Sequence, residues 1–119
     1  MKKIKDSFKF AFNGLKETLI FERNFQIMLA AALLMAGAVF YFDATRTEKA
    51  VIFTAIFAVL TLELVNTAIE RILDFLEPNH HEQVRIIKDL MAAVVLVACF
   101  GAIIIGLIVF WPHFFSGAI

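Results

Sequence analysis

The stretch AVIFTAIFAVLTLELVNTAIERILD, residues 50–74, starts with an uncharged apolar run and ends with acidic side chains at helical spacing. At about 100° per residue, Glu63, Asn66, Glu70 and Asp74 fall within an arc of roughly 80° around a helix. Ionisable side chains in a membrane helix are costly and usually mark functional sites. The stretch therefore predicts a spanning helix whose inner end holds a cation or moves a proton.

Composition supports a membrane protein. The chain has 119 residues, 61% of them hydrophobic, and includes 14 phenylalanines. A soluble domain of this size cannot bury so much apolar surface, whereas lipid can solvate it. The net charge of zero gives no indication of a nucleic-acid partner, and we expect none. The single Cys99 excludes an internal disulfide and favours a packing role over a redox role.

The uncharged runs predict an all-α membrane protein with three transmembrane helices. A spanning helix needs about 20 apolar residues, with about 17 as a lower limit. The first run (25–42, interrupted only by Gln26) and the last (90–111) meet this length, and the middle run does so if it continues to about Ile69. We expect one domain, residues 1–119, with the spans in helices 25–42, 48–76 and 82–111.

Residues 1–24 are typical of an amphipathic interfacial helix. Phe8, Phe12, Leu15 and Leu19 recur every three or four residues, and lysines lie off this stripe. Such a helix lies in the membrane surface with its apolar face towards the lipids. Gly14 within it suggests a close contact or a bend.

Four further residues mark expected helix ends and surroundings. Thr47 is the predicted N-cap of the second spanning helix, and Pro78 is expected to stop it. We expect Trp111 to be an interfacial anchor at the end of the third helix, and His113 to be solvated.

Basic residues predict the orientation. Nine lysines and arginines fall in segments 1–24 and 71–89, which share one side of a three-span protein, and only Arg46 and Lys49 fall on the other. The positive-inside rule then places the N-terminus in the cytoplasm. We therefore expect a multi-pass membrane protein.

The acidic stripe suggests divided roles. Glu63 and Glu70 are about 10 Å apart along the helix axis, too far to share one ion. Glu63, the deeper and less hydrated residue, suits a general base, and Glu70 suits Mg²⁺, which takes one or two carboxylates plus phosphate oxygens. Glu22 could supply the second carboxylate, and Asn66 could orient a hydroxyl or a phosphate. The alternative is a polar seam that joins helices.

Lys88 and Asp89 lie at the same predicted boundary. Lys88 either snorkels towards the membrane surface or, facing Glu22 and Glu70, clamps a phosphate. The chain has no P-loop and no other glycine-rich phosphate-binding motif. His80, His81 and Glu82 form a weak candidate metal cluster, and a turn with solvated histidines is the favoured interpretation.

Four segments together resemble a known family. AFNGL (11–15), ERNF (22–25), ELVNTAIERILD (63–74) and KD (88–89) are similar to motifs of the small bacterial lipid kinases, which include integral-membrane diacylglycerol kinase and undecaprenol kinase. The resemblance implies a homotrimer in the bacterial cytoplasmic (inner) membrane that takes ATP and Mg²⁺ from the cytoplasm and a lipid alcohol from the bilayer. It assigns Glu63 as catalytic base and Glu22 and Glu70 as metal carboxylates. It places Asn66, Asp74, Lys88 and Asp89 along the nucleotide and phosphate site, with Asn66 and Glu63 also meeting the lipid substrate.

These observations predict ATP-Mg-dependent phosphorylation of a membrane lipid alcohol at the cytoplasmic interface. The ERNF segment and the ending GLIVFWPH (106–113) are more similar to undecaprenol kinases, with diacylglycerol as the alternative substrate. A small oligomeric transporter coupled to protons or cations is the alternative from another class. A purely structural membrane subunit is a third, less favoured because it would not need Lys88 and Asp89 beside three acids.

Overall fold

The computed structural model describes residues 2–79 and 81–116, and it contains four helices within them. These are α1 (Lys2–Phe21), α2 (Arg23–Tyr41), α3 (Arg46–Leu76) and α4 (Glu82–Ser116). By length and composition, α2, α3 and α4 are able to cross a membrane. The expected all-α class, with three transmembrane helices and an additional N-terminal helix, is confirmed.

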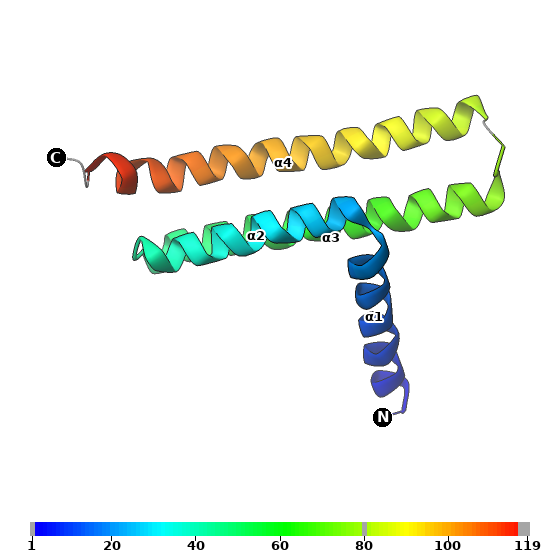
Figure 1. Ribbon diagram of the computed structural model, residues 1–119, viewed down its shortest axis with the longest axis horizontal. Coiled ribbons are helices and arrows are strands. Elements are labelled where there is room, and N and C mark those ends of the chain that lie inside the picture. The colour runs from blue at the N-terminus through cyan, green and yellow to red at the C-terminus, as the bar shows by residue number, and fades with distance from the viewer. Residues whose placement is uncertain (1, 80, 117–119) are drawn as a thin grey trace.

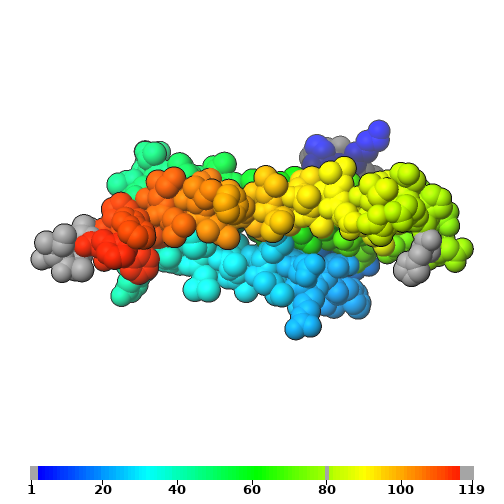
Figure 2. All heavy atoms as spheres, turned by 90° about the horizontal axis from the view of Figure 1, so that it is seen from above, coloured from blue at the N-terminus to red at the C-terminus, as the bar shows by residue number. Residues whose placement is uncertain are grey.

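α2, α3 and α4 run side by side, and α1 turns away across their common direction (Figure 1). α3 packs against both α2 and α4. Viewed from above, α4 lies over the seam between α2 and α3 (Figure 2). If α2–α4 cross the bilayer, α1 lies along its surface, which is where an amphipathic helix is stable.

The small buried core lies near the turn between α2 and α3. It comprises Val39, Ala44, Ile52, Val109 and Phe110. Most other large apolar side chains are exposed, as expected where lipid rather than protein solvates them. At Gly106 a Cβ atom would come within 2.9 Å of Met35 Cε, the far end of a flexible side chain that could move to make room for it.

Thr45, not Thr47, is the N-cap of α3, so the predicted cap and the start at residue 48 were wrong. The Glu48 backbone N–H donates to Thr45 Oγ1 at 3.1 Å, and the Thr45 N–H donates to Glu48 Oε1 at 2.9 Å. This reciprocal pair is a capping box. The turn before it is tight, since Asp43 adopts a positive φ of 50°, which Asp tolerates better than most residues.

The last helix is longer than predicted. α4 continues through Pro112 to Ser116 instead of ending at residue 111. His113, which we expected to be solvated, is only partly exposed, and its Nε2 lies 3.2 Å from Glu48 Oε1. The ring of Phe42 also packs edge-on against Phe114, with centroids 4.9 Å apart. These contacts hold the end of α4 against the start of α3 despite the proline.

The other end of α3 agrees with the sequence. The helix stops at Leu76, two residues before Pro78, as predicted. In α1 the expected close contact at Gly14 is absent, since a Cβ there would meet nothing within 4 Å among the described residues. The apolar stripe of α1, including Phe8 and Phe12, is exposed as a membrane-facing surface requires.

Candidate active site

Glu63 on α3 is the buried acid of the described residues. Its side chain is 4% exposed, and its neighbours Asn66 and Thr67 are each 6% exposed. The three residues share the face of α3 that packs into the bundle. A buried carboxylate is costly unless neighbouring polar groups or a ligand satisfy it, so the surroundings of Glu63 are informative.

Those surroundings combine an amide with two further acids. The Asn66 side chain lies close to the Glu63 carboxylate and interacts with it, and both Glu70 and Glu22 lie close enough to interact with it electrostatically. Cys99 of α4 is also within electrostatic reach of Glu63. Of the three glutamates that the sequence analysis selected, Glu22 and Glu70 are thus within electrostatic reach of Glu63.

Asn66 retains an unused acceptor. Its Oδ1 atom is buried and has no hydrogen-bond partner within residues 2–79 and 81–116. A buried polar atom without a partner is rare and needs an explanation. An acceptor beside a buried carboxylate fits a hydroxyl group that enters the site.

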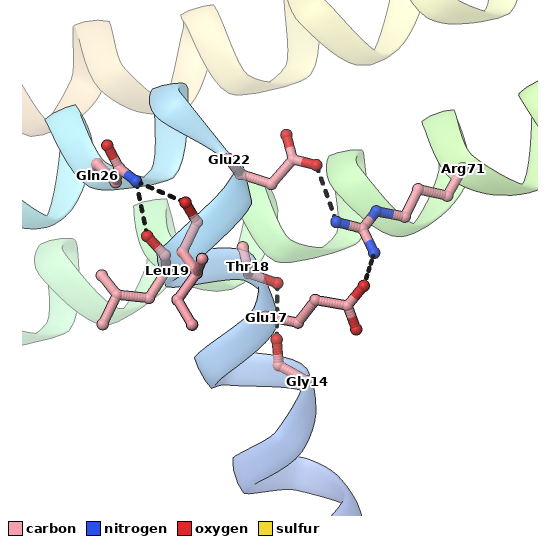
Figure 3. A network of polar contacts seen from close by, with 8 residues as sticks. Gly14, Glu17, Thr18, Leu19, Glu22, Gln26 and Arg71 are labelled. Atoms are coloured by element: carbon pink, nitrogen blue, oxygen red, sulfur yellow. Dashed lines mark hydrogen bonds and ion pairs between the residues drawn. The ribbon is translucent and has the colours of Figure 1, made fainter.

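Glu22 reaches this region because the chain turns a corner there. It is the single residue between α1 and α2, and its backbone is extended (φ −104°, ψ 107°). Its N–H donates to the Thr18 carbonyl at 2.9 Å, and its own carbonyl accepts from the Gln26 N–H at 3.1 Å. The Gln26 side-chain amide donates to the Leu19 carbonyl at 2.7 Å and so satisfies the open end of α1 (Figure 3).

Arg71 joins this corner to α3, a contact that the sequence analysis missed. Its Nη1 donates to Glu17 Oε1 and its Nη2 to Glu22 Oε1, each at 3.0 Å (Figure 3). Arg71 follows Glu70 directly and so lies beside the acidic stripe. Its partners are 54 and 49 residues away in the chain, so no local pattern could reveal the pairing.

The remaining predicted site residues form a second polar group. Lys88 Nζ lies 2.6 Å from Asp74 Oδ1, which links α4 to α3. Asp89 accepts a hydrogen bond from Arg85 at 2.8 Å, and Arg85 also pairs with Glu82. The expected contact of Lys88 with Glu22 and Glu70 is not among the interactions of the described residues, where its partner is Asp74.

The candidate histidine cluster is only partly described. His81 Nδ1 accepts a hydrogen bond from the Gln83 N–H at 3.1 Å, which organises the start of α4. His80 lies outside the described residues. His81 is therefore accounted for as part of the turn, in agreement with the favoured interpretation.

The two polar groups lie at different heights along the bundle. The α3–α4 connection extends well beyond the level where α1 meets α2 (Figure 1). α3 has 31 residues, or about 46 Å of helix, against a hydrocarbon core of about 30 Å. Asp74 is near the C-terminal end of α3 and Lys88 near the start of α4, so their ion pair lies towards the α3–α4 connection, whereas Glu63 is farther back along α3.

A metal at this site would complete its shell with water or with oxygens of a bound molecule. No group of three or more His, Cys, Asp or Glu residues that could hold a metal ion occurs in the described part of the chain. Mg²⁺ commonly binds to one or two carboxylates and completes its shell with water and phosphate oxygens. Glu22 and Glu70, the two acids within electrostatic reach of Glu63, have the donor chemistry for such an ion.

An apolar cavity lies between the spanning helices on the membrane side of Glu63. Its volume is about 350 Å³, and its walls come from α2, α3 and α4, including Met28, Ala32, Val59, Leu60 and Cys99. Cys99 lines the cavity and also lies within electrostatic reach of Glu63, so the cavity extends close to this buried acid. An apolar space beside a carboxylate is suited to a molecule with an alkyl chain and a polar end.

Comparison with known proteins shows which family this sequence matches. Residues 9–110 match the family model for prokaryotic diacylglycerol kinase. The chain is 39% identical to undecaprenol kinase of Bacillus subtilis (strain 168) over 106 residues, covering 89% of this chain and 86% of the relative. It is 29% identical to diacylglycerol kinase of Escherichia coli (strain K12) over 105 residues, covering 88% and 86%.

A third relative, the diacylglycerol kinase of Synechocystis, is 32% identical over 103 residues, which cover 84% of this chain and 58% of the longer relative. None of these relatives supports the transporter alternative. With three helices able to span a membrane and a family match over most of its length, the chain belongs to the prokaryotic diacylglycerol kinase family and is a membrane lipid kinase that uses ATP.

Proposed function

We propose that this kinase phosphorylates undecaprenol at the cytoplasmic face of the bacterial inner membrane. The greater identity to the Bacillus subtilis undecaprenol kinase than to the diacylglycerol kinases, at similar coverage, supports this choice. The apolar cavity beside Glu63 supports an acceptor with a long hydrocarbon chain.

The observation that carries the proposal is the buried pair of Glu63 and Asn66. The lipid hydroxyl donates to Glu63, which removes its proton as the hydroxyl oxygen bonds to the γ-phosphorus of ATP. The bond between that phosphorus and the oxygen bridging to the β-phosphate breaks, and ADP is the leaving group. The side-chain amide of Asn66 interacts with this carboxylate and helps to fix its position, and Asn66 Oδ1 has no partner among the residues that the structure describes. Phosphoryl transfer depends mainly on positioning and charge neutralisation, so a few fixed residues suffice.

The phosphate donor approaches from the projecting α3–α4 connection. Lys88 leaves Asp74 to neutralise a phosphate of ATP, and Asp74 and Asp89 line the same surface. Glu22 and Glu70 hold Mg²⁺, which would supply neutralisation of phosphate charge when bound. The residues therefore divide between a lipid-facing group at Glu63 and a water-facing group at Lys88.

The active protein is a homotrimer with a cytoplasmic N-terminus. The excess of basic residues on the N-terminal side supports this orientation, and the resemblance to the small lipid kinases supports three subunits. Native mass spectrometry in detergent would measure the subunit number. Labelling of cysteines introduced at Lys5 and Lys49, in a Cys99→Ala background, would report the two faces separately.

The decisive experiment supplies the purified protein with γ-labelled ATP and either undecaprenol or diacylglycerol in mixed micelles. We expect transfer of label into undecaprenol at a kcat/KM at least tenfold above that for diacylglycerol. The Glu63→Gln variant is the matched control for background transfer. A preference for diacylglycerol would overturn the substrate assignment, and no transfer to any lipid alcohol would overturn the assignment of the site.

A further inference from the structure

Arg71 is held between two carboxylates that come from different segments. One arm of its guanidinium binds Glu17, within α1, and the other binds Glu22, at the α1–α2 corner (Figure 3). Arginine is suited to this because its rigid, planar fork can hold two acceptors at once, whereas the lysine ammonium acts as a point charge. Arg71 therefore fixes the position of Glu22 relative to α3.

The hydrogen bond to Arg71 engages only one oxygen of Glu22. Arg71 Nη2 binds Oε1, and the other carboxylate oxygen points away from the guanidinium (Figure 3). Carboxylates that ligate metals are commonly oriented in this way by a neighbour that binds the second oxygen. The free oxygen is the one available to a divalent cation.

Without a compensating negative charge, the positive charge of Arg71 would oppose the binding of a cation at Glu22. A cation beside Glu22 would repel a second cation, since like charges near a protein surface interact appreciably. Glu17 compensates for that charge, because it binds the other arm of the same guanidinium. The Arg71–Glu17 pair is neutral overall, so it orients Glu22 without cancelling its negative charge.

The two ion pairs of Arg71 are expected to add little to the stability of the fold. The side chains of Arg71, Glu17 and Glu22 are 45%, 56% and 32% exposed. Exposed ion pairs contribute little to folding because water competes for both partners and their side chains lose entropy. The contact is better explained by where it places Glu22.

We propose that Arg71 is a positioning residue that orients Glu22 for the divalent cation and couples that carboxylate to the interfacial helix α1. The inference rests on the proposed role of Glu22 and Glu70 as cation ligands. It assigns a task to Glu17 as well, which is to neutralise Arg71. Neither Arg71 nor Glu17 is among the site residues that the sequence analysis selected, although Arg71 lies within the segment 63–74.

The test measures cation binding directly, without turnover. Full-length protein in detergent is titrated with Mn²⁺ in the absence of nucleotide, and free Mn²⁺ is followed by electron paramagnetic resonance. We expect Arg71→Met to raise the Mn²⁺ Kd about 10- to 100-fold, which is typical for loss of a group that orients a ligand. Arg71→Lys should give a smaller increase because it can hold only one carboxylate.

Two further variants separate orientation from charge. Glu17→Gln leaves Arg71 uncompensated beside Glu22, so it should also raise the Mn²⁺ Kd. In the Arg71→Met background the same change should have little effect, since there is no longer a charge to compensate. Arg23→Gln is the matched control: it removes a positive charge next to Glu22, and Arg23 forms no ion pair among the described residues. It should change the Kd less than twofold.

The coupling to α1 has its own readout. Hydrogen exchange of the backbone amides of residues 15–21 should become faster in Arg71→Met than in Arg23→Gln, because the end of α1 loses its attachment to α3. This measurement does not depend on metal binding or on activity.

The outcomes distinguish this inference from the proposed function. Unchanged or tighter Mn²⁺ binding in Arg71→Met would overturn the positioning role. So would an increased KM for ATP with unchanged Mn²⁺ binding, because that result would make Arg71 a phosphate ligand. If Glu22→Gln and Glu70→Gln also left Mn²⁺ binding unchanged, the proposed cation site itself would be wrong.

Discussion

The ammonium of Lys88 lies 2.6 Å from the Asp74 carboxylate, so the third spanning helix is tied to the second beyond the level of the buried Glu63. A lysine paired with one carboxylate is a point charge that can transfer to a phosphate. The structure thus records Lys88 with Asp74 as a partner, which the proposed contact with ATP would replace.

Loss of that lysine should weaken the use of ATP more than the use of lipid. We expect Lys88→Ala to lower kcat/KM for ATP about 100-fold, in line with the loss of one electrostatic contact to a transition state. Lys88→Arg should retain more activity, since it keeps the charge. Steady-state kinetics at saturating lipid would measure both. A normal kcat/KM for ATP in Lys88→Ala would show that Lys88 merely joins the helices.

Removal of the base should affect turnover selectively. Glu63→Gln keeps the shape of the side chain but cannot accept the hydroxyl proton, so kcat should fall about 10²–10⁴-fold, the range typical of general base catalysis. Binding of an ATP analogue should stay within twofold of the unmodified protein. Isothermal titration calorimetry would check binding, and near-normal turnover would remove the assignment of Glu63.

Metal removal should stop the reaction reversibly. EDTA should abolish transfer, and added Mg²⁺ should restore it, because phosphate charge must be neutralised. Glu22→Gln and Glu70→Gln should each raise the Mg²⁺ concentration that gives half-maximal rate. Activity measured against free Mg²⁺ concentration would show this. Full activity in excess EDTA would contradict a role for both carboxylates.

The capping box offers a test of stability away from the site. Thr45→Ala removes the acceptor for the Glu48 N–H and should cost about 1 kcal/mol. A loss of this size should lower Tm by about 4 °C. Thr47→Ala, two residues along on the same turn, is the control and should leave Tm nearly unchanged. Thermal unfolding in detergent would compare them, and equal shifts would rule out the special role of Thr45.

The general plan of the fold was predictable because long uncharged runs have few alternatives in a membrane. The N-cap was missed although the signal was present: Thr45 and Glu48 have the threonine-to-glutamate spacing of a capping box, and Thr47 does not. The extension of α4 through Pro112 could not be predicted locally, because the contact of His113 with Glu48 joins residues 65 apart.

The candidate site likewise contains residues that the sequence predicts and a residue that it does not. Glu63, Asn66 and Glu70 share a face of one helix, so spacing alone was enough to place them together. Glu22 comes from another helix, and its proximity to Glu63 followed from depth in the membrane. Arg71 was missed because its role depends on two partners from the α1 region, and nothing in residues 63–74 indicates which acids it meets.

The corner at Glu22 has a mechanical consequence. One residue alone separates the amphipathic helix α1 from α2, the first of the helices able to cross a membrane. Tilting or lifting of α1, as when the bilayer thins or curves, would turn the chain at the same residue that is proposed to hold the cation. A change in the thickness or curvature of the surrounding bilayer would then shift one carboxylate at the reacting centre of this kinase. No dedicated sensor domain would be needed for that response.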